Sequence, residues 1–353
     1  MSVRDLALYF LRLGALGFGG PVALANAMRR DLVDERGWLT ADEFDEGLAL
    51  SAACPGPLAY QLAVYCGYIR FGFTGGLAVA FTFALPPFLI VVAAAALYRT
   101  FENAHALRAL FYGVAPAIVA IIAKACWNLG RKTLKNDVRA WAFAAIACAI
   151  VVAVERELAW LFIGAGVIGL FVFARPKRAV AMSITPELFL FFFKTGLLVF
   201  GSGLVIVPFL KTQVVDQYHW LTMQQFLDSV AIGMISPGPV VITATFVGYL
   251  LAGWAGAIAA TLGIFSPPVL FVLAATPLLR RYRASRWIQA FIRGVSTAVV
   301  GVLVATTWLI ARTAVVDPWT FTIAALALAV TAFTRVPDPA VIAAAALVGL
   351  VVR

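Results

Sequence analysis

The sequence predicts an all-α polytopic membrane protein with an inverted-topology internal repeat, each half holding about five spans plus a re-entrant or broken helical hairpin. Three observations predict this fold class: the apolar composition, a sequence repeat and the distribution of basic loops. Of 353 residues, 63% are apolar and 12% charged, with a mean hydropathy of +0.96. Soluble domains carry about 25% charged residues. A soluble enzyme, a nucleic-acid-binding protein and a disordered chain are therefore excluded.

The chain repeats itself. A shift of 182 residues, which later becomes 181, aligns residues of the types that chance similarity between apolar sequences would not match. These pairs are Gly14 with Gly196, Trp38 with Trp220, Pro55-Gly56-Pro57 with Pro237-Gly238-Pro239, Gly72 with Gly253, and Pro86-Pro87 with Pro267-Pro268. The repeat predicts an N-terminal domain at 1–178 and a C-terminal domain at 179–353.

Six apolar segments follow one another in each half and predict helices, since no soluble or barrel-like pattern accompanies them. In the first half they cover residues 6–27, 46–69, 73–98, 106–130, 140–154 and 158–174. In the second half they cover residues 186–210, 228–252, 254–278, 288–312, 317–333 and 337–353.

The basic loops predict that the halves face opposite ways. The strongest are 131–139, 175–178 and 280–286, which the positive-inside rule places in the cytoplasm. The repeat equivalent of 131–139 is 312–317, and that of 280–286 is 99–105. Each of these two equivalents lies one span from a cytoplasmic loop and so falls outside. Equivalent loops on opposite sides indicate an inverted repeat.

Inversion requires an odd number of crossings, so one of the six segments in each half must fail to cross. The first segment, 6–27 with its copy 186–210, is the candidate for a re-entrant hairpin, because glycines interrupt it midway. The short pair 140–154 and 158–174 is the alternative.

Two breaks in each half predict a binding site: the glycine cluster and the Pro-Gly-Pro motif. Proline stops or kinks a helix, and a helix restarting after it presents free N–H groups that bind anions. A simple kink is the alternative for each motif. For the Ser and Thr side chains among the candidates listed next, the alternative is a hydrogen bond to the backbone of their own helix. The candidate binding residues at the breaks are Gly19, Gly20, Pro21, Cys54, Pro55, Gly56, Pro57 and Gln61, then Gly201, Ser202, Gly203, Ser236, Pro237, Gly238, Pro239, Thr243 and Thr245.

Charged residues near the breaks suggest how an anion is handled. Arg12 and Lys194 occupy matched intramembrane positions with no matched acid, so a visiting anion is expected to supply the counter-charge. Snorkelling to the headgroups is the alternative. Glu46 and Asp228 precede the Pro-Gly-Pro motifs and are candidates for coupling transport to protons, with a solvated first helical turn as the alternative.

Nothing in the sequence predicts a metal, a cofactor or an enzyme. The four cysteines lie in apolar stretches without CxxC spacing, and the two histidines are far apart. The spans carry neither a Ser/His pair nor paired carboxylates of the kind a catalytic centre requires.

The motifs together resemble the chromate ion transporter (CHR) family in its long, two-domain form. Those that carry the resemblance are Phe18-Gly19-Gly20-Pro21, Gly37-Trp38-Leu39-Thr40 and Cys54-Pro55-Gly56-Pro57, followed by Phe200-Gly201-Ser202-Gly203, Trp220-Leu221-Thr222 and Ser236-Pro237-Gly238-Pro239. The resemblance implies a multi-pass protein of the bacterial inner (plasma) membrane that exports chromate, a tetrahedral dianion, and so confers chromate resistance. For the inverted, duplicated architecture we expect transport by alternating access.

A sulfate or other small-anion carrier, and an anion channel, remain alternatives to a chromate exporter. The expected partners are a chromate- or sulfate-like oxyanion and membrane lipid, with a homo-oligomer left open and no nucleic acid.

Overall fold

The structure is a computed structural model, and it is helical along almost all of the chain that it describes. The described residues are 1–18, 20–54, 56–101, 104–134, 137–154, 184–198, 200–201, 206–282, 286–334 and 336–353. The predicted segment 158–174 lies outside these ranges, so its path stays a prediction.

The helices form two compact units, and each unit draws on both halves of the sequence. The first comprises Met1–Glu102, Ile184–Ile206 and Ser229–Tyr282, and the second Asn103–Ser183, Val207–Asp228 and Arg283–Arg353. These units group helices by contact, whereas the predicted boundary near residue 178 divides the chain by sequence similarity. The two-domain prediction therefore stays a prediction.

The first unit contains the early helices of both halves. Its elements are α1 (Val3–Leu16), α2 (Gly20–Arg29), the π-helical turn η1 (Arg30–Glu35), α3 (Ala41–Ala53), β1 (Gly56–Pro57), α4 (Leu58–Phe101), α8 (Ile184–Leu198), β2 (Phe200–Gly201), the end of α10 (Met223–Ile235), the short 3₁₀ turn η4 (Val240–Ile242) and α11 (Thr243–Tyr282).

Polar caps fix where α1 and α3 begin. Ser2 accepts a hydrogen bond from the backbone N–H of Asp5, and the Asp5 carboxylate accepts one from the N–H of Ser2. Thr40 and Glu43 form the same reciprocal pair at α3. Such capping boxes satisfy amide groups that a helix leaves unpaired at its start.

The chain turns back at the first glycine cluster. Tyr9 in α1 donates a hydrogen bond to Asp31 in η1 at 3.1 Å, although 22 residues separate them. A straight helix would hold the two about 33 Å apart. The prediction for 6–27 requires this reversal, whereas the re-entrant placement of the hairpin in a membrane stays a prediction; in its copy, residues 202–205 lie outside the described ranges.

A second reversal lies at Pro-Gly-Pro, where the sequence predicted only a break. The Arg70 guanidinium lies 2.5 Å from the Glu43 carboxylate, 27 residues away, so the start of α3 meets residues 58–70 of α4 at their far end. Midway between tip and base, Gly47 packs against the ring of Tyr65. Residues 41–53 and 58–70 are therefore the two arms of a hairpin with Gly56 at its tip. Each arm is about 20 Å long, too short to cross a bilayer core of about 30 Å.

The long helices α4 and α11 are each bent at repeat-equivalent positions. Phe71 and Gly72 in α4, and Ala252 and Gly253 in α11, leave the helical region of φ and ψ. These bends fall where the sequence predicted the ends of 46–69 and 228–252. After them, residues 73–101 run about 43 Å, enough to cross a membrane.

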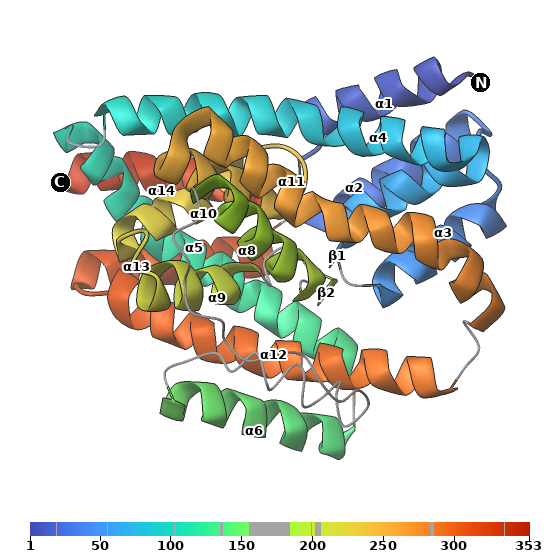
Figure 1. The fold of residues 1–353 in the computed structure, drawn as a ribbon. Coiled ribbons are helices and arrows are strands. Elements are labelled where there is room, and N and C mark those ends of the chain that lie inside the picture. The colour runs from blue at the N-terminus through green and yellow to red at the C-terminus, as the bar shows by residue number, and fades with distance from the viewer. Residues whose placement is uncertain are drawn as a thin grey trace. The chain divides into compact units, whose positions relative to one another are not determined.

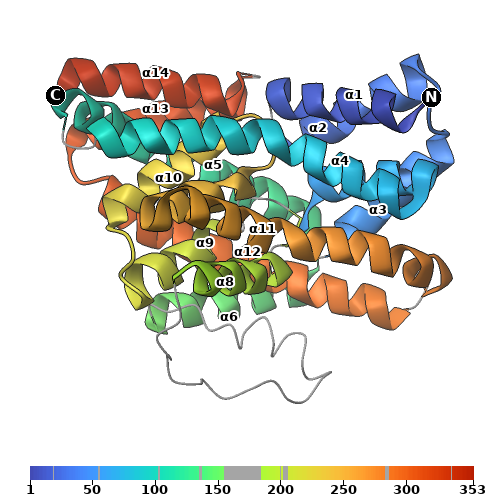
Figure 2. The same cartoon turned by 45° about the horizontal axis from the view of Figure 1, so that its top comes forward.

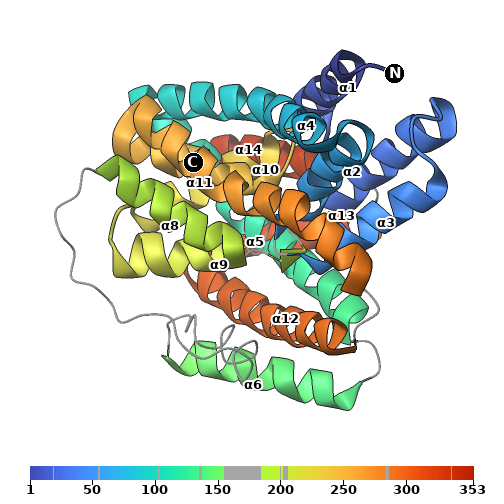
Figure 3. The same ribbon diagram turned by 45° about the vertical axis from the view of Figure 1, so that its right-hand side comes forward.

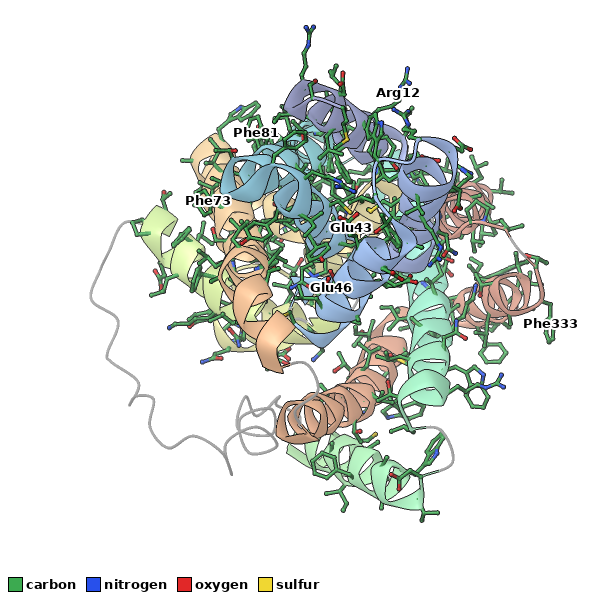
Figure 4. All side chains as sticks on the ribbon, turned by 90° about the vertical axis from the view of Figure 1, so that its right-hand side faces the viewer. Arg12, Glu43, Glu46, Phe73, Phe81 and Phe333 are labelled. Atoms are coloured by element: carbon green, nitrogen blue, oxygen red, sulfur yellow. The ribbon has the colours of Figure 1, made fainter. Side chains whose placement is uncertain are left out.

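Within the described residues, three helices are long and apolar enough for a span: Leu58–Phe101, His105–Arg131 and Val240–Ala274. Shorter apolar helices cover Ala140–Ala149, Val300–Ala314, Pro318–Phe333 and Asp338–Val352. An all-α membrane protein, as the composition predicted, accounts for these lengths and for the many exposed apolar side chains, such as Phe73 and Phe81 in Figure 4.

Equivalent helices of the two halves pack in equivalent ways in the first unit. Helix α1 lies along α4 (Figure 2), and α8 lies along α11 (Figure 3). Helices α4 and α11 run in opposite directions (Figure 1). Gly76, early in α4 after its bend, lies against Leu273 late in α11, and Phe88 lies against Trp254.

The second unit contains the later helices of both halves. Its elements are α5 (His105–Leu134), α6 (Val138–Val154), α9 (Ile206–Leu210), the π-helical turn η3 (Lys211–Gln217), the start of α10, α12 (Arg286–Ala314), α13 (Pro318–Phe333) and α14 (Asp338–Val352). Helix α6 packs along α12 (Figure 1), and α5 packs against α13 and α14. Small residues such as Gly113 and Ala345 let α5 and α14 approach closely.

Candidate functional site

The broken segments of the two halves meet in the first unit. The tip of the first Pro-Gly-Pro hairpin pairs with the glycine segment of the second half, as a short parallel bridge of Gly56 to Phe200 and Pro57 to Gly201. The tip of the second Pro-Gly-Pro pairs with the glycine segment of the first half, since the Gly238 N–H donates to the Gly17 carbonyl at 2.9 Å. The exchange is reciprocal, so each break binds the break of the other half.

Prolines on the long helices complete the same exchange. A Cβ placed on Gly56 would lie 2.9 Å from Cβ of Pro268, and one on Gly238 would lie 3.1 Å from Cγ of Pro87. The repeat aligns Pro87 with Pro268. The sequence contained this signal in the matched Pro-Pro pairs, yet only the packing reveals that each proline faces the tip from the other half.

A helix or helical turn begins directly after each tip. Residues 58–70 of α4 and the turn η4 that precedes α11 both begin immediately after a Pro-Gly-Pro tip. The first amides of a helix have no partner within it, and they give its start a partial positive charge of about half a unit. Two such ends at the tips favour a negatively charged ligand.

The polar candidates of the first half are buried at its tip. Gln61 is 0% exposed, and its side-chain amide lies over Gly56, where a Cβ would be 2.6 Å from Nε2. The Cys54 thiol, just before the tip, is also buried and free. Gly20 and Pro21 form the first turn of α2, where proline is well tolerated because a missing N–H costs nothing there.

The hydroxyls of the second half are buried and engaged with the protein. Thr243 donates to the Val240 carbonyl at 2.8 Å, and Ser236 donates to the Gly233 carbonyl at 3.0 Å. The Thr245 hydroxyl shares a hydrogen bond of 2.7 Å with that of Thr261. These contacts are the structural alternative that the sequence left open for hydroxyls in spans.

Four of the predicted site residues cannot be placed. Gly19, Pro55, Ser202 and Gly203 lie outside the described ranges, whereas Pro237 and Pro239 are buried beside Gly238.

The side chains of the two predicted cations do not point into the packed interior. Arg12 and Lys194 are both exposed, and Figure 4 shows the Arg12 side chain pointing outward from the ribbon. Their placement fits snorkelling towards headgroups or water, which was the alternative reading. We therefore leave both cations out of the proposed site.

The two predicted coupling acids lie in different units. Glu46 is half-buried in α3 of the first unit. Asp228 is buried in α10 of the second unit and accepts a hydrogen bond from the Gln224 amide at 2.8 Å.

The ion pair between Glu43 and Arg70 was not predicted from the sequence. It closes the base of the Pro-Gly-Pro hairpin of the first half (residues 41–70), called the first hairpin below. Glu43 and Arg70, which are 27% and 29% exposed, have no charged counterparts in the second half, where Gln225 and Leu251 stand. Repeat alignment could have flagged this asymmetry, but not the contact itself.

Within the described ranges, no group of three or more His, Cys, Asp or Glu side chains is placed to hold a metal ion.

A helical, apolar chain whose broken segments pair with one another inside one compact unit defines a multi-pass α-helical membrane protein that can handle a polar solute at its helix breaks. The chain belongs to the chromate transporter family, whose family model matches residues 4–170 and again 186–350. The two matches cover both halves in turn.

Relatives match over nearly the whole chain and are named as transport proteins, not enzymes. The chromate transport protein of Cupriavidus metallidurans is 42% identical over 99% of this chain and 93% of its own length. The probable chromate transport protein of Synechococcus elongatus is 38% identical over 99% and 95%. The chromate transport protein of Pseudomonas aeruginosa is 34% identical over 87% and 80%. No solved structure matches the chain.

Proposed function

We propose that this protein transports chromate across the bacterial inner membrane and binds it where the two Pro-Gly-Pro tips and the glycine segments meet. The relatives named as chromate transport proteins support the substrate. The observation that carries the site is the reciprocal pairing of the tips, Gly56 with Phe200 and Gly238 with Gly17.

The chemistry of the tips suits a tetrahedral dianion. Chromate offers four oxygen atoms that accept hydrogen bonds, and the helix that begins after each tip offers its first backbone amides as donors. Binding by partial charges rather than by a buried cation leaves the site neutral when it is empty. An empty neutral site within the bilayer costs less than one that holds an uncompensated charge.

An inverted repeat and alternating access form part of the proposal. With 6–27 and 46–69 both folded back, inversion requires an odd number of crossings among the four remaining segments of the first half, so the short segments 140–154 and 158–174 do not both cross. The opposite directions of α4 and α11, the reciprocal tip contacts and the charge distribution of the loops all support inversion. Alternating access then consists of one set of arms opening while its inverted equivalent closes.

Cysteine labelling tests the inversion. Thr74 and Ala255 are exposed equivalents directly after the two bends. Single cysteines at these positions, in a background without native cysteines, are expected to react with a membrane-impermeant thiol reagent from opposite faces. Labelling of both from one face would refute the inverted arrangement.

Export is the direction that the membrane potential favours. In a cell that is negative inside, a dianion leaving the cytoplasm gains about 4.6 kcal/mol per 100 mV. Proton coupling is a second source of energy, for which Glu46 and Asp228 are our candidates. Asp228→Asn is expected to remove the dependence of transport on a pH gradient while chromate exchange continues.

Flux measurements in liposomes test the function and its rivals. Uptake of labelled chromate that saturates and shows counterflow is expected of a carrier, whereas a channel would show neither. Competition by sulfate, molybdate and phosphate decides between a chromate transporter and a sulfate or general small-anion carrier. Stronger competition by sulfate than by unlabelled chromate would favour the sulfate carrier.

A further inference from the structure

We propose that Ser51 is an anion-binding residue of the first hairpin, donating its hydroxyl to an oxygen of the transported oxyanion. This inference rests on the proposed function, because it assigns a contact within the same site. The Ser51 side chain is 0% exposed, and its Oγ has no hydrogen-bond partner among the residues that the structure describes.

The hairpin geometry places Ser51 beside the start of the second arm. The contacts of Glu43 with Arg70 and of Gly47 with Tyr65 fix how the arms face each other. Ser51 follows Gly47 by one helical turn on the same face of α3, which brings it level with Gln61. It therefore faces the first turn of residues 58–70, where the amides have no partner within their own helix.

An unused hydroxyl is unusual for a buried serine in an apolar helix. Serine and threonine in such helices ordinarily donate to a carbonyl one turn earlier. Thr195 does so, donating to the Phe191 carbonyl at 3.0 Å. A buried hydroxyl without a partner is costly, so its retention next to unpaired helix-start amides indicates a ligand that accepts from both.

The second half does not reproduce this donor. The repeat equivalent of Ser51 is Gly233, and the space that a side chain would fill there is taken by the Thr243 hydroxyl. That hydroxyl already donates to the Val240 carbonyl. The proposal therefore makes the site asymmetric. Of the two equivalent positions, only Ser51 supplies a hydroxyl, because Gly233 has no side chain.

Ser51→Ala tests the inference because it removes the hydroxyl and leaves the helix intact. Counterflow of chromate is measured in liposomes for the parent, for Ser51→Ala and for Thr195→Ala, a buried threonine whose hydroxyl is bonded within its own helix. Losing one hydrogen bond to a charged ligand is expected to raise the half-saturating chromate concentration about 10-fold in Ser51→Ala. Thr195→Ala is expected to match the parent.

A second measurement separates binding from folding. Without an anion, Ser51→Ala is expected to unfold at the parent temperature or above it, because the variant no longer buries an unpaired hydroxyl. Saturating chromate is expected to raise the unfolding temperature of the parent more than that of the variant. A lower unfolding temperature without anion would overturn the inference, because Ser51 would then have a structural role.

The transport measurements can also overturn the inference. An unchanged half-saturating concentration in Ser51→Ala would overturn the inference and leave the proposed function standing. An equal rise in Thr195→Ala would overturn it as well, because altered packing would then explain both. If the parent transports none of chromate, sulfate, molybdate and phosphate, the proposed function fails and this inference fails with it.

Discussion

Gly56 is the residue whose replacement tests the tip arrangement most directly. Its φ is +137°, a conformation that glycine adopts freely and other residues rarely adopt. A Cβ at this position would lie 2.6 Å from Nε2 of Gln61 and 2.9 Å from Cβ of Pro268. The Gln61 side chain can rotate, but the proline ring is rigid, so Gly56→Ala must displace the tip or the long helix behind it.

The loss of folding stability expected for Gly56→Ala is the sum of a backbone cost and a packing cost. A non-glycine residue held in such a conformation costs about 1–3 kcal/mol. Forcing a methyl group into a filled site costs about 1–3 kcal/mol more. Gly72 supplies the matched control, because its φ is also positive, at +64°, yet nothing lies within 4 Å of where its Cβ would stand. The two alanine variants are therefore expected to differ by the packing cost alone.

Thermal unfolding in one detergent and chromate flux in liposomes measure the two effects. Gly56→Ala is expected to unfold at a lower temperature than Gly72→Ala and to lose most of its flux at temperatures where it is still folded. Gly72→Ala is expected to keep its flux. Equal unfolding temperatures and equal flux for the two variants would refute the claim that the tip is closely packed against the other half.

Three further variants probe other parts of the structure. Glu43→Gln keeps the cap of α3 but breaks the ion pair with Arg70. Because the pair is partly exposed, a double-mutant cycle on Glu43 and Arg70 is expected to give a coupling free energy of about 1 kcal/mol or less. A far larger value would contradict the weak coupling expected of an exposed pair. Joint neutralisation of Arg12 and Lys194 to glutamine is expected to leave chromate flux within about twofold of the parent, since both side chains are exposed; abolished flux would return both cations to the site. Gly113→Ala is expected to destabilise the protein by about 1–3 kcal/mol in thermal unfolding, because its Cβ would overlap the carbonyl of Ala345; an unchanged unfolding temperature would contradict the close packing of α5 on α14.

Much of the helix layout could be predicted from the sequence because local chemistry fixes it. The bend at Gly72 and its equivalent at Gly253 fall between apolar segments that the sequence separates. The Pro-Gly-Pro break follows from local chemistry, because two prolines around a glycine strongly disfavour a continuous helix, even though Pro86 and Pro87 lie inside α4.

The candidate site was only partly predictable. Gln61 was selected from its distance to the break, and the structure buries it over the tip. Arg12 was selected because it stands in an apolar segment, but which face of α1 it occupies depends on how α1 packs on α4. Ser51 was missed, because a hydroxyl in an apolar helix ordinarily bonds to its own backbone.

The sequence by itself determined that the chain is an apolar, helical and duplicated membrane protein, with breaks at fixed places. Composition, periodicity and the conformational limits of proline and glycine act over a few residues, and they are readable along the chain. Only the tertiary structure decided that the chain reverses at Gly56 and that this tip pairs with Phe200 of the other half. Such partners are chosen by packing among segments more than a hundred residues apart, which no local pattern encodes.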